Sequence, residues 1–392
     1  MDVKAACSNA LTLEMAVDEV ANQLSTITPT VLVVAFNTCF SGEALLMELE
    51  LRFQCVIVGC TSCKGSFCVN DEYSSANASL SVLAILDLEG NYGVGQHELN
   101  PDDVISSARN ALDMALYASG RGYESPAVIW CMLPPGQEET IIAGFQSVVG
   151  DKVPILGGSS ADNDVSGQWQ QVSTLIADSN QIVVLVLYPS SPLSHAFSSG
   201  YKPSDNKVTV TKSNGRILEQ LNAVSASTLY NHLTQNAIES HLYGGDILSV
   251  STMFPLGRLV SSNSQYEEYL LSHPHMVTTQ GELTLFSEVA DGDELTIMVG
   301  SRDSLIHRAE RVLANALELL DDDVKPVGVL MIYCAGCMLA IDDDLEKMVD
   351  ELRDCYPGLP IVGFYTFGEQ GCFMDGKSRH GNLMISALVF TK

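Results

Sequence analysis

Two pairs of cysteines in this sequence have the Cys-x-x-Cys spacing: Cys60 with Cys63, and Cys334 with Cys337. Two thiolates on one tight turn can bind a single ion at about 2.3 Å, so the two pairs together would supply four ligands to zinc or to an iron–sulfur cluster. Alternatively, a thiolate of low pKa beside a resolving thiol would make a redox switch. Because cysteine is among the residues most often buried, core packing is the third interpretation of these pairs.

A second candidate site is the segment YLLSHPHMV, residues 269–277, which places His273 and His275 on either side of a proline among apolar neighbours. A haem needs one axial imidazole in an apolar cleft. We therefore predict His275 as the proximal ligand of a haem b, with His273 and Tyr269 beside it and His241 as the second choice. The sequence has no Cys-x-x-Cys-His attachment motif, so such a haem would be bound without covalent links. The alternative is that these are ordinary strand-end histidines.

Two glycine-rich turns form a third candidate site. GGSSAD (residues 157–162) and GFYTFGEQG (residues 363–371) each follow an apolar, strand-like run. Backbone N–H groups on such turns can hold a small polar ligand. The candidate ligand-binding residues here are Gly158, Ser159, Asp162, Tyr365 and Glu369. The alternative is that the glycines only permit tight turns.

Signatures of catalysis are missing from the chain. It has no Gly-x-Ser-x-Gly elbow, no Gly-x-x-x-x-Gly-Lys phosphate loop and no His-Glu-x-x-His helix. We therefore predict no catalytic residues and expect a binding protein that is not an enzyme.

Three repeated units must position these residues. Each unit has an apolar strand, a loop, an amphipathic helix and a second apolar strand that ends in glycine. The units span residues 30–60, 126–162 and 326–371, each with a helix before it (15–24, 104–117 and 305–320) and a strand after it (80–88, 181–188 and 383–390). Their continuous Val, Ile and Leu runs indicate strands buried on both faces. The predicted fold class is therefore α/β, with mixed, largely buried sheets covered by helices.

The predicted domain boundary lies near residues 191–201, where turn-forming residues concentrate. It divides the chain into residues 1–195 and 196–392. The region from 194 to 290 is more polar than the three units and holds five of the eight histidines. If the first and third units pack with parallel strands, their cysteines lie beyond the carboxyl ends of those strands, where open sheets bind ligands.

The net charge of −28 excludes partners that are themselves polyanions. Its field repels phosphate backbones and anionic lipid surfaces, so nucleic acid and membrane are not expected as partners. The first 20 residues lack a secretory pattern, and apolar runs such as IVVLVLY (residues 182–188) have the length of strands. These features predict a cytoplasmic protein.

Four segments resemble the signature segments of the FIST family. They are VPILGGSSADN (153–163), DGDELTIMVGSRDSLIHRAERVLANAL (291–317), IYCAGC (332–337) and LPIVGFYTFGEQG (359–371). The resemblance implies an N-terminal and a C-terminal FIST domain, and a small-ligand sensor coupled to a signalling partner. The paired thiols depart from the family pattern, which commonly has Arg where Cys337 stands.

Finer expectations follow from the same resemblance. A stand-alone chain of this length is similar to the FIST proteins that bind haem, sense nitric oxide and act on a histidine kinase in biofilm, cyclic-di-GMP or quorum signalling. Two alternatives are a sensor of amino acids or similar metabolites, which would use the glycine-rich turns, and a metal or redox switch, which would use the cysteine pairs. A homodimer is left open.

Overall fold

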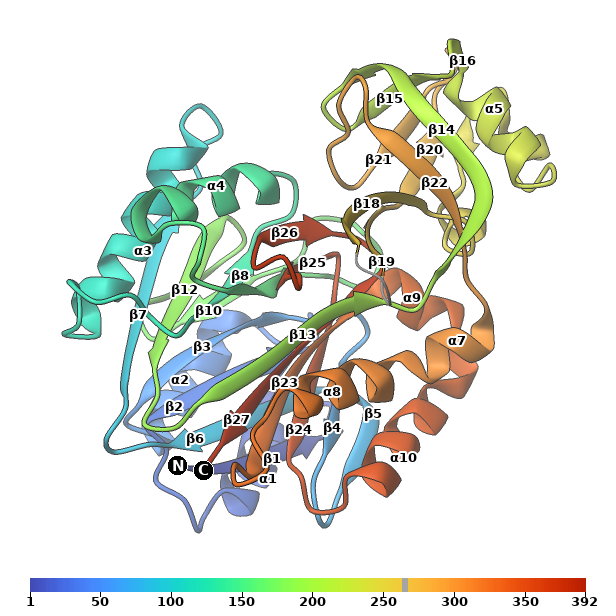
Figure 1. Cartoon of the computed structure of the whole chain (residues 1–392). Helices are drawn as coiled ribbons and strands as arrows, with labels where there is room; N and C mark the ends of the chain where they lie inside the picture. Colours follow the sequence, from blue (N-terminus) through green and yellow to red (C-terminus); the bar gives the residue numbers. More distant parts are fainter. Residues whose placement is uncertain (263–266) are drawn as a thin grey trace.

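The computed structural model describes residues 1–262 and 267–392, which form two lobes (Figure 1). We call residues 1–199 and 300–392 the body, and residues 200–299 the insertion. The chain leaves the body after β13 (Leu193–Ser199) and returns to it at α7 (Arg302–Ile306). Among the described helices, none has the length and apolar character needed to cross a membrane.

The body contains three units with one strand order, which confirms the repeat predicted from the sequence. Each unit contributes four adjacent strands to a mixed sheet, and two neighbouring strands at one end of the four are parallel. In sheet order, the first sheet has β1 (Asp2–Ser8), β6 (Leu80–Leu86), β2 (Val31–Phe36) and β3 (Val56–Thr61). The second sheet has β7 (Asn91–Glu98), β12 (Gln181–Tyr188), β8 (Val128–Leu133) and β9 (Ile155–Ser159) in the equivalent order. The third sheet has β13, β27 (Met384–Thr391), β23 (Pro326–Cys334) and β24 (Ile361–Thr366).

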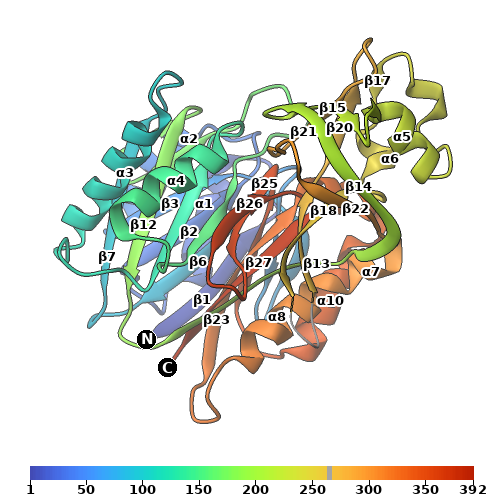
Figure 2. The ribbon, with the colours of Figure 1, turned by 45° about the horizontal axis from the view of Figure 1, so that its top comes forward.

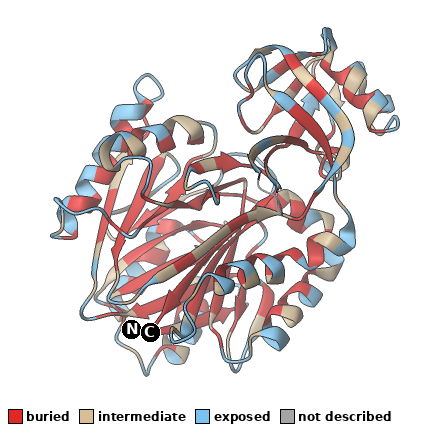
Figure 3. Ribbon diagram, in the orientation of Figure 1, coloured by how far each residue is buried: buried red, intermediate tan, exposed pale blue. Residues whose placement is uncertain are grey.

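The three sheets share one core between their inner faces. Side chains alternate along each strand, so Val31, Val33 and Ala35 of β2 point into this shared core, while Leu32, Val34 and Phe36 face helices. Figure 3 shows the buried strands at the centre and the exposed helical surfaces outside them. This mixed α/β architecture confirms the predicted fold class.

The helices cover the outer faces of the sheets with their apolar sides (Figure 2). The first sheet is covered by α1 (Leu13–Gln23) and α2 (Gly42–Arg52), and the second by α3 (Val104–Ala118) and α4 (Glu138–Val149). The third is covered by α7, α8 (Arg308–Glu318), α9 (Ala335–Ala340) and α10 (Leu345–Cys355), and the short η2 (Asp342–Asp344) lies between the last two along the chain.

Each sheet is completed by a β-hairpin from another unit. The hairpin β4 (Ser66–Val69) and β5 (Ser74–Ala78) follows the first unit but pairs with β24 of the third sheet. The hairpin β10 (Gln171–Ser173) and β11 (Ile176–Asp178) of the second unit pairs with β3. The hairpin β25 (Gly368–Cys372) and β26 (Ser378–Gly381) of the third unit pairs with β9. The exchange therefore runs in a closed cycle.

The insertion has its own nine-stranded sheet and apolar core. Its strands are β14 (Lys202–Asn214), β15 (Ile217–Leu221), β16 (Val224–Ser225), β17 (Gly245–Asp246), β18 (Leu256–Ser262), β19 (Glu267–Ser272), β20 (Pro274–Val277), β21 (Leu283–Leu285) and β22 (Glu294–Val299). Its helices are α5 (Ala226–Leu233), η1 (Glu239–His241) and α6 (Leu248–Ser251).

Candidate functional site

The second parallel strand of each unit ends at one shared junction, which positions most of the predicted ligand-binding residues. Just beyond β3, β9 and β24, three backbone hydrogen bonds join these three segments of the chain to one another. These bonds run from Ala161 to Thr61, from Cys63 to Tyr365 and from Phe367 to Ser159, at 3.1, 3.0 and 3.1 Å. Each unit therefore donates one bond and accepts one.

At this junction, Tyr365 and Glu369 make their hydrogen bonds within the protein. The Tyr365 hydroxyl donates to the carbonyl of Ala76 at 2.8 Å. The Glu369 carboxyl accepts from the amide of Met384 at 3.0 Å and from the hydroxyl of Thr366 at 3.1 Å. Burial raises the pKa of Glu369 well above its usual range.

Gly158, Ser159 and Asp162 lie on the neighbouring strand and its following loop. Gly158 is the cross-strand partner of Glu369, so the structure brings these two predicted residues together. The Ser159 hydroxyl donates to Oε1 of Glu138 at 2.7 Å. Asp162 accepts bonds from four backbone amides in residues 164–168 and thereby fixes the loop after β9.

The first cysteine pair is divided between two cores. Cys60 lies in the shared core, 3.2 Å from the sulfur of Met132, whereas Cys63 lies in the core beneath the helices of the third sheet. Burial raises the pKa of both thiols to about 12. In the described ranges, no three of the four predicted metal-ligating cysteines have their sulfur atoms within 4.8 Å of one another. The structure therefore does not bring the two pairs together as one ligand set.

The second cysteine pair has a different environment. Cys337 is fully buried, and its sulfur lies 2.9 Å from Nη1 of Arg308 and 3.4 Å from the hydroxyl of Tyr201. Burial alone would raise its pKa. Hydrogen bonding from the Cys334 thiol, the charge of Arg308 and the contacts with Tyr201 and Arg308 outweigh burial and lower the pKa to about 6. Cys337 is therefore a thiolate at neutral pH.

His273 and His275 both pack against the ring of Phe286, with ring centroids 5.9 and 4.7 Å away. His273 is buried, and its Nε2 lies 3.2 Å from both the Leu248 carbonyl and the Thr252 hydroxyl. Burial lowers its pKa to about 3. His275 is half-buried, and its Nε2 lies 3.5 Å from Oδ2 of Asp246.

The other two residues of the predicted haem site lie elsewhere in the insertion. His241 ends η1, and its Nδ1 lies 2.9 Å from the hydroxyl of Ser240. Tyr269 lines a cavity of about 350 Å³ with Tyr201, and its hydroxyl donates to Glu267 at 2.9 Å. Neither His273 nor His275 is among the residues that line this cavity.

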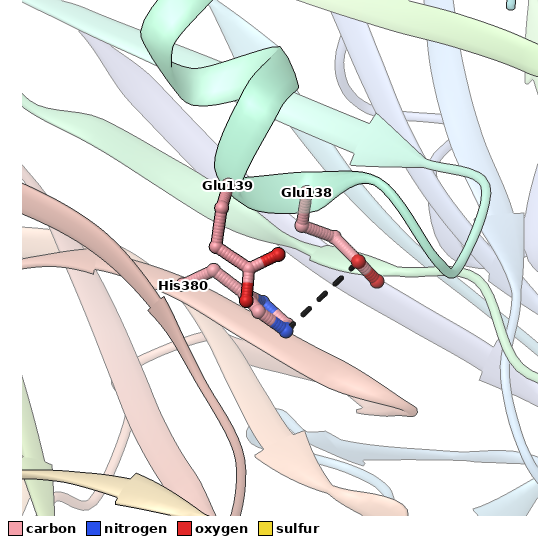
Figure 4. Close-up of side chains that lie close together, drawn as sticks. All are labelled: Glu138, Glu139 and His380. Carbon is pink, nitrogen blue, oxygen red and sulfur yellow. Dashed lines mark ion pairs between the residues drawn. The ribbon is translucent and has the colours of Figure 1, made fainter. Parts of the chain in front are cut away.

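Arg216 of the insertion contacts a cluster of charged residues of the body, of which Figure 4 shows Glu138, Glu139 and His380. Glu138 and Glu139 begin α4, His380 lies on β26, and Arg216 lies in the turn between β14 and β15. Nη2 of Arg216 lies 2.6 Å from Oε2 of each glutamate. Nε2 of His380 lies 4.0 Å from Oε2 of Glu138. The two carboxylates and the imidazole are close enough to hold a metal ion, but the guanidinium of Arg216 already supplies the cation.

Glu138 is the buried centre of this cluster, with only 2% of its surface exposed. Burial would raise its pKa, but His380, Arg216 and the Ser159 hydroxyl together lower it to about 2. Its position in the first turn of a helix also favours a negative charge. Glu138 therefore stays ionised inside the protein and ties the insertion to the body through Arg216.

A cavity of about 340 Å³ lies beside this cluster, between the body and the insertion. Its walls carry charges of both signs together with apolar side chains. The lining residues are Glu139, Ile142, Gln146, Arg258, Leu270, Ser287, Glu288, Val289, Ala290, Ser378, Arg379 and His380. Sequence analysis missed this site. The one local signal was the acidic pair at the start of a helix in the segment PPGQEET.

The family comparisons agree with the resemblance found in the sequence. The FIST N domain model matches residues 31–224, and the FIST C domain model matches residues 226–372. The family models thus meet near residue 225, and the division predicted at residues 195 and 196 stays a prediction. No curated protein sequence matches the chain.

The structure is similar to a crystal structure of cyanuric acid hydrolase from A. caulinodans. The alignment covers 98% of this chain and 97% of that one, at 9% sequence identity and a TM-score of 0.40. A likeness at this level carries no argument about chemistry. The two domain models, which follow one another along the chain, do identify it: the chain belongs to the FIST family of sensory-domain proteins.

Proposed function

We propose that this protein is a sensor, and not an enzyme, that binds an amino acid or a similar zwitterionic metabolite in the cavity between body and insertion. The observation that carries the proposal is the charge distribution of this cavity. Arg258, Arg379 and His380 lie around one space with Glu139 and Glu288. A ligand with both a carboxylate and an ammonium group would find partners for each.

The chemistry of the lining fits such a ligand. Arginine binds carboxylates through charge-assisted hydrogen bonds, and Arg258 and Arg379 each use some of their N–H groups on Asp293 and Asp375. Glu288 is exposed and available to an ammonium group. Ile142, Leu270 and Val289 give the cavity an apolar wall for a side chain. The volume lies at the lower end of the range for small-molecule sites, roughly 300 Å³ upward.

The position of the cavity suggests how binding would become a signal. Its walls come from α4 and β26 of the body and from β18, β19 and the segment after β21 of the insertion. A ligand that contacts both lobes stabilises the relative position of the lobes in which residues of both contact the ligand. A partner that contacts both lobes would then distinguish the bound from the free form. A histidine kinase is the partner that the family resemblance predicts.

Binding of the free amino acids to haem-free protein, measured by isothermal titration calorimetry, tests the proposal. We expect saturable binding of at least one amino acid, and a loss of about tenfold in affinity in Glu288→Gln, because a hydrogen bond to a charged group contributes roughly 1.5–3 kcal/mol. Glu318→Gln, the same change on the exposed face of α8, should bind as the wild type does. Absence of binding at millimolar concentrations of every amino acid would overturn the proposal.

Haem binding and nitric oxide sensing stay a second prediction, which rests on the family resemblance. The relevant observation is that His275 is partly exposed and stacked on Phe286, so a haem would approach it from the surface of the insertion. Binding at His275 and binding in the cavity use different residues. The two functions can therefore be tested separately.

A further inference from the structure

The segment from Cys334 to Cys337 brings two thiols together inside the body. Cys334 ends β23 and precedes α9, and Cys337 is the third residue of that helix. The Cys334 thiol helps to lower the pKa of Cys337, and only 4% of Cys334 and none of Cys337 is exposed. Ala335 and Gly336 between them are small. A dithiol on one turn is a geometry in which a disulfide can form with little movement of the backbone.

The groups around Cys337 form a buried ion pair. The guanidinium of Arg308 contacts the sulfur and donates its other amino group, Nη2, to the carbonyl of Leu383 at 2.7 Å. The rings of Tyr201 and Tyr333 lie 5.8 and 5.2 Å from its central carbon. Glu369 also acts electrostatically on both members of the pair, and burial raises the pKa of its carboxyl well above the usual range. The thiolate is therefore the anion that directly compensates Arg308.

Three residues around the cysteine pair connect it to the insertion. Tyr201 immediately precedes β14, at the point where the chain enters the insertion, and Arg308 begins α8 soon after the chain leaves it. His273 belongs to the insertion itself, and its ring approaches Gly336 so closely that an added Cβ would lie 3.3 Å from it. The cysteine pair is thus in contact with both connections between the lobes.

We propose that Cys334 and Cys337 form a dithiol–disulfide switch, oxidised by a hydroperoxide, which changes how the insertion is held on the body. This site is separate from the zwitterion cavity, and its function does not depend on the function proposed above. It shares no residue with the lining of that cavity.

The reaction balances with hydrogen peroxide as the oxidant. The Cys337 thiolate attacks one peroxide oxygen, the O–O bond breaks, and Cys337 sulfenic acid and hydroxide form. The sulfur of Cys334 then attacks the sulfenic sulfur, the S–O bond breaks, and the departing hydroxide takes the thiol proton as water. Two sulfurs lose two electrons in total, and the peroxide gains them.

Oxidation removes the negative charge that faces Arg308. A buried guanidinium without a counter-charge is strongly unfavourable, and breaking a buried ion pair by removing one member is far more costly than losing an exposed pair. The oxidised protein can relieve this cost by moving Arg308 or Tyr201 toward solvent. Either movement displaces a segment that connects the insertion to the body.

The experiment uses the full-length protein, reduced and then exposed to hydrogen peroxide. After alkylation, peptide mapping by mass spectrometry should find Cys334 and Cys337 joined, 2 Da lighter than the dithiol peptide and protected from alkylation. Cys39 and Cys355 are exposed and report the reactivity of accessible thiols in the same sample. Oxidation of Cys39 and Cys355 while Cys334 and Cys337 remain fully alkylated would overturn the proposal.

Two further measurements separate a switch from a structural ion pair. In Cys334→Ser, dimedone should trap a sulfenic acid at Cys337, whereas Cys355→Ser should still form the disulfide. Hydrogen exchange of wild-type residues 200–203 and 300–308 should become faster on oxidation and return to its initial rate after reduction. Unchanged exchange in a protein that carries the disulfide would contradict the coupling to the insertion.

Discussion

Arg216 supplies the closest positive charge to a carboxylate that is buried in the body. Glu138 lies at the start of α4, where the hydroxyl of Ser159 and the amide of Gly136 supply hydrogen bonds, and the one nearby cation of the body, His380, is 4.0 Å away, against 2.6 Å for Arg216. An ionised carboxylate in such a place needs a cation nearby. The guanidinium arrives from a turn of the insertion, so a single side chain links the stability of the body to the position of the other lobe.

Replacing Arg216 with Met should therefore destabilise the protein. The change leaves the Glu138 carboxylate buried without its closest cation, for which we expect a loss of about 3 kcal/mol in the free energy of unfolding, measured in urea. Arg353→Met removes an exposed arginine that also pairs with two acidic residues, and it should cost less than 1 kcal/mol. Equal losses in the two variants would contradict this assignment of Arg216.

Acid should weaken the same contact within a defined pH range. The pKa of Glu138 is about 2 in the folded protein and 4.5 for an ordinary glutamate. Because the folded value is the lower one, the stabilisation is fully present above pH 4.5 and is lost as the pH falls toward 2. It amounts to roughly 3 kcal/mol. Urea midpoints measured from pH 6 to pH 3 should fall more steeply for the wild type than for Glu138→Gln, and parallel curves would rule out this contribution.

The haem prediction also belongs to a single residue. His275→Ala should abolish or markedly weaken haem binding and leave the fold intact, because the axial bond to iron is lost. The measurement is the Soret absorbance per protein after reconstitution, with His97→Ala as the matched control. A Soret band of unchanged intensity in His275→Ala would refute the assignment.

At the scale of elements, the three units share a glycine at one position of the second parallel strand. Gly59, Gly157 and Gly363 occupy equivalent positions on β3, β9 and β24, each two residues before the residue whose carbonyl accepts a hydrogen bond at the junction. A Cβ on Gly59 would lie 1.9 Å from the carbonyl oxygen of Val34, and one on Gly363 would lie 1.9 Å from the ring of Phe67. Only glycine fits these positions without moving a neighbour.

Gly59→Ala should consequently destabilise the first sheet. We expect a loss of roughly 2–3 kcal/mol in the free energy of unfolding, since the added methyl group must push two paired strands apart. Gly122→Ala, at a position where the nearest atom lies 3.7 Å from the added carbon, should change it by less than 0.5 kcal/mol. Thermal unfolding of both variants under one condition provides the comparison.

The elements differ in how well the sequence predicts them. Long apolar strands such as β2 and β12, and helices such as α3, follow from local patterns of side chains. The exchanged hairpins do not, because β10 has only three residues and its partner β3 lies more than 100 residues earlier. The contact between Glu138 and Arg216 cannot be predicted from local patterns either, because these residues are 78 positions apart in the chain. The glycine-rich turn predicts Tyr365 and Glu369 as candidates, but only the structure shows their bonds within the protein.

At the scale of the whole molecule, the cyclic exchange of hairpins makes the units of the body depend on one another. The third sheet ends in β4 and β5 from the first unit, and the second sheet ends in β25 and β26 from the third. Three sheets also share one core. We expect the body to unfold in one cooperative transition.

A chain cut at residues 195 and 196 tests this dependence. Residues 1–195 lack the hairpin that pairs with β9, and residues 196–392 lack the hairpin that pairs with β24. Expressed separately, neither fragment should show a sigmoidal urea transition by circular dichroism, whereas the two fragments expressed together should restore one. A cooperative transition in either isolated fragment would show that the exchange is dispensable for its stability.

The path of the hairpin β4–β5 also sets an order of events on the ribosome. It is synthesised among the first 78 residues, but β24, the strand with which it pairs, begins at residue 361, roughly 280 residues later. At 5–20 residues per second, the nascent hairpin waits roughly fifteen to fifty-five seconds for its partner strand. During that time Phe67 and Val69, which are buried in the finished protein, have no sheet to cover them. This interval is the part of biosynthesis in which a ribosome-associated chaperone would have the most to protect.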